Sequence, residues 1–117
     1  MELVVIVLNR IEFLTDILNG FVDEGLKGAT TIDSAGMGRI MAEYIPFFAR
    51  FADLDDGERQ HSKTIFTVVK SEEERNKAVE IVENIVGDIN EPDTAFIFSL
   101  PVNFVKGFSC QGRNDKE

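Results

Sequence analysis

The sequence is poor in basic residues and cysteine, and each shortage excludes a class of function. Only 12 Lys and Arg stand against 21 Asp and Glu, which gives a formal net charge of −9. Duplex DNA and anionic membranes both require a basic face, so we expect neither nucleic acid nor a membrane among the partners. The single cysteine, Cys110, cannot form an internal disulfide or a cysteine metal cluster. Such usage is typical of a reducing compartment.

Long apolar runs and histidine are scarce as well. The apolar run 3–8 is far shorter than the ~20 residues of a membrane span. No basic region precedes it and no small-residue cleavage site follows it, so we predict no signal peptide and a cytoplasmic location. The one histidine, His61, and the acidic stretch 53–58 lack the spacing of a zinc or calcium site, so no metal is predicted. No catalytic constellation stands out, and we predict that the chain is not an enzyme.

Four short runs rich in apolar or β-branched residues have the character of strands. We place these strands at residues 3–8, 29–33, 63–69 and 94–100. Apolar residues at helical spacing run from Ile11 to Val22 and stop before Gly25, which suits a left-handed cap. A second helix is predicted from the capping box Ser71–Glu74 to about Val86. The element order is therefore β-α-β, a long connection, and β-α-β.

This order predicts a single α+β domain over 1–117 with a ferredoxin-like βαββαβ sandwich. Two right-handed crossovers give a four-stranded antiparallel sheet with two helices on one face. The first strand is apolar at both its odd and its even positions, which point to opposite faces. Two helices cannot cover both faces, so we expect the other face to pack between subunits.

The connection between the second and third strands, about 35–62, is unusually long for a compact domain and shows no convincing regular element. It opens with the step Gly36-Met37-Gly38-Arg39. Glycines permit close approach and positive φ, and arginine offers a fork of donors, so the step suits either an anionic ligand or a plain turn. An aromatic run follows at Tyr44, Phe47, Phe48 and Phe51. It predicts a partner-binding surface, or else a segment that packs against its own assembly. A polar tail is predicted over 109–117.

Two patches resemble the PII-like signal-transduction proteins of nitrogen regulation. The first is DEGLKGAT at 23–30 with GMGR at 36–39, and the second is FIFSLPV at 96–102. The resemblance implies a homotrimeric regulatory protein that binds ATP, ADP or another adenine nucleotide in clefts between subunits. The long connection would then change shape with the ligand and engage a transporter or an enzyme.

The resemblance also implies roles for individual residues. Thr30 would approach the adenine, Val68 would pack on the base, the Gly36-Met37-Gly38 step would line the cleft, and Arg39 would reach the phosphates. The family's lysine-bearing phosphate loop is replaced here by residues 91–96. Its glutamine after the glycine step is replaced by Ile40, and its basic pair falls near Gly107 and Ser109.

Two alternatives share the same scaffold. Receptors for cyclic di-AMP also place a glycine-rich step after the second strand and end in a similar strand. A structural subunit whose cleft has lost its ligand would show the same elements.

Overall fold

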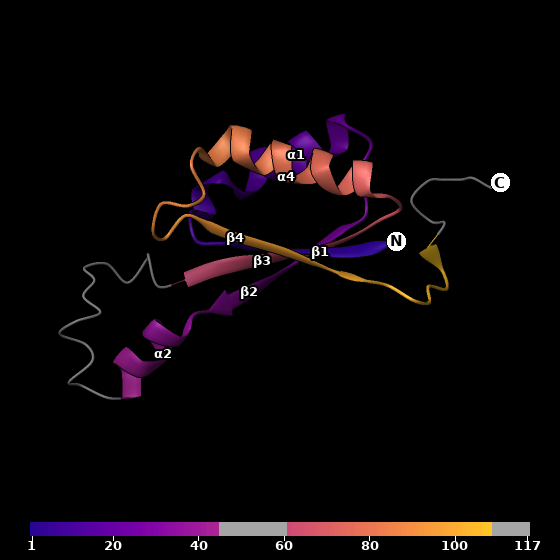
Figure 1. The fold of residues 1–117 in the computed structure, drawn as a ribbon. Coiled ribbons are helices and arrows are strands. Elements are labelled where there is room, and N and C mark those ends of the chain that lie inside the picture. Colours follow the sequence, from indigo (N-terminus) through magenta and orange to yellow (C-terminus); the bar gives the residue numbers. More distant parts are fainter. Residues whose placement is uncertain (45–60, 109–117) are drawn as a thin grey trace.

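The structure is a computed structural model that describes residues 1–44 and 61–108. Its elements are β1 (Glu2–Leu8), η1 (Ile11–Phe13), α1 (Leu14–Asp23), β2 (Ala29–Ala35), α2 (Met37–Tyr44), β3 (His61–Val69), α4 (Glu72–Val86) and β4 (Ala95–Pro101). The strands form one antiparallel sheet in the order β2-β3-β1-β4. Helices α1 and α4 lie together over one face of this sheet (Figure 1). The predicted ferredoxin-like α+β fold is confirmed.

The core lies between that sheet face and the two helices. The even positions of β1 point into it, and Val4, Ile6 and Leu8 are fully buried. Their partners from the other elements are Ile17 and Phe21 of α1, Ile65 and Val69 of β3, and Ala78 and Val82 of α4. The core thus uses one side of β1 and leaves the odd positions for the opposite face.

Local signals explain how α4 begins and how α1 ends. The Ser71 hydroxyl accepts a hydrogen bond from the backbone N–H of Glu74 at 3.2 Å, as the capping box predicts. The Glu74 carboxylate accepts from the backbone N–H of Lys70 at 2.8 Å rather than from that of Ser71. After α1, Gly25 adopts φ +87, which only glycine takes without strain.

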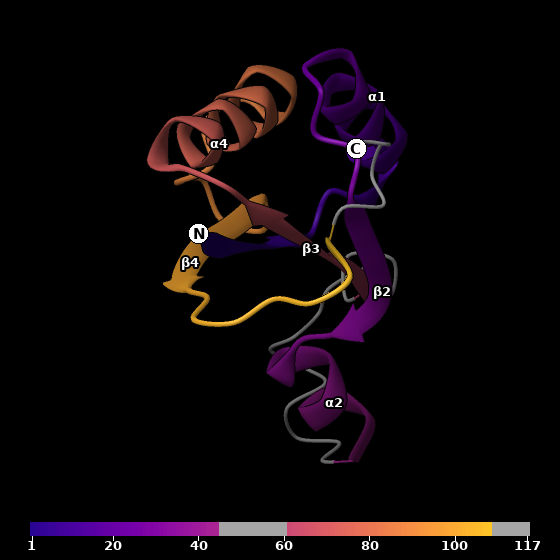
Figure 2. The ribbon, with the colours of Figure 1, turned by 90° about the vertical axis from the view of Figure 1, so that its right-hand side faces the viewer.

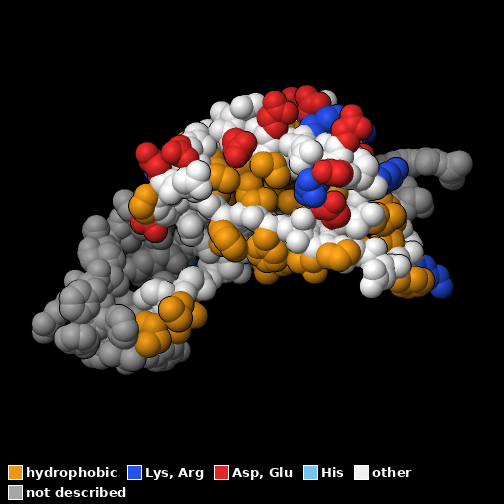
Figure 3. All heavy atoms as spheres, viewed as in Figure 1, with side chains coloured by type: hydrophobic (Ala, Val, Ile, Leu, Met, Phe, Trp, Pro, Cys, Tyr) orange, Lys and Arg blue, Asp and Glu red, His pale blue; other side chains and the backbone are white. Residues whose placement is uncertain are grey.

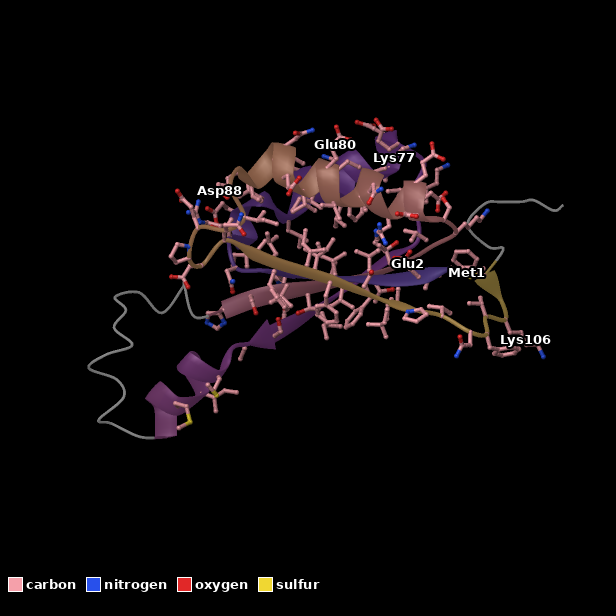
Figure 4. The ribbon with its side chains drawn as sticks, in the orientation of Figure 1. Met1, Glu2, Lys77, Glu80, Asp88 and Lys106 are labelled. Carbon is pink, nitrogen blue, oxygen red and sulfur yellow. The ribbon has the colours of Figure 1, made fainter. Side chains whose placement is uncertain are left out.

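An ion pair joins α4 to the start of the sheet. The Arg75 guanidinium lies 3.2 Å from the Glu2 carboxylate, and it also pairs with Glu72. Figure 4 shows Glu2 at the start of β1, whereas Lys77 and Glu80 lie on the outer side of α4. Hydrogen bonds from Ser99 and then from Arg75 hold the pKa of the Glu2 carboxyl below its ordinary value.

The hairpin of β2 and β3 is longer than predicted. The prediction ended the second strand at Asp33 and began the third at Lys63, but the ladder continues through the pairs Ser34–Ser62 and Ala35–His61. Cross-strand hydrogen bonds between hydroxyl side chains support these additional pairs. They join residues far apart in the sequence and could not be read from either strand alone.

The prediction of no regular element between these strands was wrong, because Met37–Tyr44 forms the helix α2. Met37, Ile40, Met41 and Tyr44 recur at the i, i+3, i+4, i+7 spacing of an amphipathic helix. The backbone N–H of Ile40 donates to the carbonyl of Gly36 at 3.2 Å, so the helix begins directly after that glycine. The two glycines concealed this signal, because glycine is a poor helix former. Figure 2 shows α2 beyond the end of β2, on the side of the sheet away from α1 and α4.

Close packing of α1 on α4 gives a first testable prediction at Gly20. A Cβ at this position would lie 2.8 Å from Cγ2 of Ile81, and this methyl group belongs to a stiff β-branched side chain. Overpacking typically costs about 1–3 kcal/mol, which exceeds the ~1 kcal/mol that alanine gains over glycine in a helix. Gly20→Ala should therefore destabilise the fold by about 1 kcal/mol in urea unfolding, with the exposed neighbour Asn19→Ala as the control. A more stable Gly20→Ala protein would show that the helices do not meet as described.

Candidate functional site

The sheet face opposite α1 and α4 is a broad apolar surface, which we call the open face. The register of the strands places on it Leu3, Val5 and Val7 of β1, Ile32 of β2, Phe66 and Val68 of β3, and Phe96, Phe98 and Leu100 of β4. Phe96 is 61% exposed, and the ring centroids of Phe96 and Phe98 lie 5.5 Å apart. Figure 3 shows hydrophobic side chains gathered along this side of the sheet. An exposed apolar surface of this kind marks an interaction site.

Charge is distributed unequally between the two sides of the molecule. None of the described strand residues on the open face is charged, whereas α4 alone contributes Glu72, Glu73, Glu74, Glu80 and Glu83 on the other side. Figure 3 shows the acidic side chains over the helices. Two copies of a chain with net charge −9 repel each other, and the repulsion is weakest where the uncharged faces meet.

At the α2 end of the sheet, three hydroxyl groups interrupt the apolar surface. Ser34 Oγ lies 2.6 Å from Ser62 Oγ and 2.9 Å from Thr64 Oγ1. Ser62 and Thr64 are buried. Each hydroxyl has one hydrogen to donate and the two contacts use two of them, so one donor remains for a further acceptor. We call Ser34, Ser62 and Thr64 the hydroxyl cluster.

On the opposite, helix-covered side of the same two strands, an ion pair joins Asp33 to Lys63. Lys63 Nζ donates to Asp33 Oδ1 at 2.5 Å. This hydrogen bond, reinforced by the charge of Lys63, holds the pKa of the Asp33 carboxyl below its ordinary value. The carboxylate is therefore ionised at neutral pH, and its contribution to stability is lost as the pH falls through that lowered pKa. The Asp33 side chain is 85% exposed, so the pair adds little to the stability of the fold.

A pocket of about 470 Å³ lies at this end of the sheet. It is lined by residues 33–35 of β2, residues 61–63 of β3 and Ile11 of η1. The lining residues supply an ammonium, a carboxylate and an imidazole beside the apolar side chain of Ile11, whereas the strand register points the Ser34 and Ser62 hydroxyls to the open face. Gly36 and α2 come next in the chain, because Ala35 lines the pocket and is the last residue of β2.

The structure separates the predicted ligand residues into two groups. Thr30 and Val68 lie on the open face on neighbouring strands, near the end of the sheet opposite α2. Gly36, Met37, Gly38 and Arg39 follow the other end of β2. At the usual rise of a strand the two groups are roughly 20 Å apart. One ligand could contact both groups of a single subunit only by running the length of β2.

Gly36 and Gly38 of the Gly-x-Gly-Arg step do not adopt the positive φ that glycine readily permits. Positive φ occurs at Gly25, Gly87 and Gly107 among the described glycines, and not at Gly36 or Gly38. A Cβ at either position would meet no described atom within 4 Å. Met37 and Ile40 are exposed. The described fold therefore gives no internal reason for glycine at these two positions.

Other sequence predictions fall outside what is described. Tyr44 is the last residue of α2, whereas Phe47, Phe48, Phe51, Cys110 and the polar tail lie outside the described residues. In the described part of the chain, no group of three His, Cys, Asp or Glu side chains could hold a metal ion. Within residues 1–44 and 61–108, no helix has the length and apolar character needed to cross a membrane.

The polar residues of the pocket were not among the predicted site residues. Asp33, Ser34, Ser62 and Lys63 were assigned to strand ends or to the long connection, and their proximity depends on the β2–β3 register. The short polar stretches Asp33-Ser34 and Ser62-Lys63, each adjoining a β-branched run, were the available signal. Comparison with models of known protein families finds no matching family, and comparison with curated proteins finds no similar sequence.

Proposed function

We propose that this chain is a non-catalytic, PII-like regulatory protein that assembles as a trimer and binds an adenine nucleotide between its subunits. The open face is the observation that carries the proposal. An apolar, uncharged sheet face with phenylalanine rings up to 61% exposed is a surface built for protein contact. Because each copy carries a net charge of −9, another copy meets least repulsion on this face.

The glycines beside α2 support a ligand at the edge of this assembly. Gly36 and Gly38 have open space around them and ordinary negative φ. A nucleotide or a neighbouring subunit that approaches the backbone closely would explain both residues, because a side chain there would fill the space. Residue 36 also directly follows Ala35, which lines the pocket that contains Lys63, so a phosphate group there would have an ammonium donor nearby.

The proposed mechanism is a shift between conformations. A nucleotide that contacts the Gly-x-Gly-Arg step would favour one arrangement of α2 and of the chain that follows, and a partner protein would recognise that arrangement. The regulator therefore needs no chemistry of its own. Its output is the difference in partner affinity between the ligand-bound and ligand-free forms.

Ligand binding is tested first by thermal unfolding with ATP, ADP, AMP, cyclic AMP and cyclic di-AMP. A specific ligand at 100 times its dissociation constant should stabilise the protein by ~2.7 kcal/mol. Stabilisation by cyclic di-AMP alone would favour the alternative receptor. No stabilisation by any of the five would contradict the nucleotide proposal and favour a structural subunit.

Arg39 corresponds to the arginine that would reach the phosphates in the PII-like resemblance. Removing its charge should therefore weaken the binding of an anionic ligand. A charge-assisted hydrogen bond contributes about 1.5–3 kcal/mol, so Arg39→Ala should raise the dissociation constant roughly 10- to 150-fold. Titration calorimetry measures this with the ligand that the thermal comparison selects. Lys77→Ala, on the outer side of α4, removes the same charge far from the step and should leave the affinity nearly unchanged (Figure 4). Equal affinity of wild type and Arg39→Ala would show that Arg39 does not contact the ligand and that the Gly-x-Gly-Arg step serves only to begin α2.

A further inference from the structure

After β4 the chain continues as a segment, residues 102–108, which we call the arm. The backbone N–H of Val102 donates to the carbonyl of Met1 at 3.1 Å, which continues the pairing of β4 with β1 by one residue. Within the part of the chain that the structure describes, residues 103–106 form no backbone hydrogen bond with another element. Figure 2 shows the arm crossing the end of the sheet towards the side of β2, on the side away from α1 and α4. The arm is therefore attached to the fold mainly at its base.

The arm carries an exposed aromatic side chain. The Phe104 side chain is 79% exposed, the largest exposed fraction among the large apolar residues of the described ranges. Phe96, Phe98 and Leu100 are exposed as well, so the arm does not cover the open face of its own chain. Phenylalanine side chains bury a large apolar area in cores and interfaces, and they are enriched where proteins meet. The described fold gives Phe104 no such burial, so a second molecule has to supply it.

The symmetry of the proposed trimer requires two different contact patches on each copy. In a closed ring of three, one patch of each subunit meets another patch of the next, whereas a patch that pairs with itself gives a dimer. The open face supplies one of these patches. The arm borders the open face, because it follows Leu100 at the end of β4, and it presents Phe104 away from its own chain. It can therefore supply the second patch.

Charge favours the same partner. The chain as a whole has a net charge of −9, whereas Lys106 places a positive charge on the arm. Lys106 is exposed, and it forms no ion pair with any described residue. Figure 4 shows it beyond the end of the sheet, away from Lys77 and Glu80 on α4. Another acidic copy attracts this cation, which offsets part of the repulsion between two chains of the same charge.

We propose that the arm docks on a second copy of this chain, where Phe104 packs against the open face of the neighbouring subunit. The inference rests on the proposed function for the trimer, and it names the element that closes the ring. Each subunit gives its arm to one neighbour and receives the arm of the other. Loss of the arm therefore weakens every contact in the assembly.

Phe104→Asp tests the arm, with sedimentation over a range of protein concentrations as the measurement and circular dichroism as the check on the fold. Truncating a central aromatic residue of an interface commonly weakens binding by tenfold or more. Phe104→Asp should therefore raise the concentration at which half of the protein is dissociated at least about 10-fold. The matched control is Val22→Asp, because Val22 is 55% exposed on α1 and should leave that concentration unchanged. A Phe104→Asp protein that is as stable a trimer as wild type would overturn the docking of the arm.

A mixture of two variants shows whether the arm meets the open face itself. Phe104→Asp keeps an intact open face, and Phe98→Asp keeps an intact arm, so one productive contact remains between the two. At the highest concentration at which each variant alone is a monomer, their mixture should contain a species of twice the 13.1 kDa of one chain. Two variants that stay separate in the mixture would contradict the contact between arm and face.

The same measurements separate this inference from the proposed function. A trimer that Phe98→Asp dissociates and Phe104→Asp leaves intact would contradict the inference alone. A wild-type protein that is monomeric at every concentration would contradict both.

Discussion

Phe98→Asp should convert the proposed trimer into monomers that keep their fold. Phe98 lies in the middle of β4 on the open face, directly opposite Val5, and it is 42% exposed in the single chain. In the assembly each copy would have to bury an unpaired carboxylate among phenylalanine and valine side chains. The desolvation cost is several kcal/mol per ion, which exceeds the free energy that burial of one apolar side chain contributes to the interface.

Sedimentation at micromolar protein measures the loss of the trimer, and circular dichroism confirms that the fold survives. The matched control is Val22→Asp, because Val22 is 55% exposed on α1 and lies away from the sheet. It introduces the same charge at a similarly exposed apolar residue, so it should leave the trimer intact. A Phe98→Asp protein that remains a trimer would show that the open face is not the subunit interface.

The largest loss of fold stability is expected for Phe21→Ala. Phe21 is 1% exposed and packs from α1 against Ile17 and the buried residues of the sheet. Truncating a buried phenylalanine removes its apolar burial and leaves a cavity, at a cost of about 3–5 kcal/mol. Small domains have a total stability of about 5–15 kcal/mol, so this substitution should bring the protein close to unfolding.

Urea unfolding at one fixed protein concentration measures this loss, since the stability of an oligomer depends on concentration. Val22, the neighbour of Phe21, provides the comparison, because Val22→Ala changes an exposed side chain on the same helix. That substitution should alter the free energy of unfolding by less than about 0.5 kcal/mol. Comparable losses for the two variants would mean that α1 presents a different face to the sheet.

The main elements of the fold could be predicted because their signals are local. Ser71 and Glu74 mark the start of α4 within four residues, and Gly25 marks the end of α1 by its need for positive φ. The alternation in β1 separates the core face from the open face. The helix α2 was not predicted, because only four residues show its apolar i, i+3, i+4, i+7 spacing and the neighbouring Gly36 and Gly38 are poor helix formers.

Less of the candidate site could be predicted, because it depends on pairing between distant residues. Nothing in the segment around Asp33 indicates that Lys63 lies beside it, and nothing near Ser34 points to Ser62. The register of β2 on β3 creates both contacts. The resemblance selected the Gly-x-Gly-Arg step and Thr30, which the structure places at opposite ends of the same strand.

The mass of the wild-type protein in solution tests the central claim most directly. Light scattering on the purified full chain over a range of micromolar concentrations gives that mass without a ligand or a partner. The account predicts a trimer, three times the 13.1 kDa of one chain. A mass of 13.1 kDa at every concentration would contradict it, because the open face would then remain exposed in the working protein.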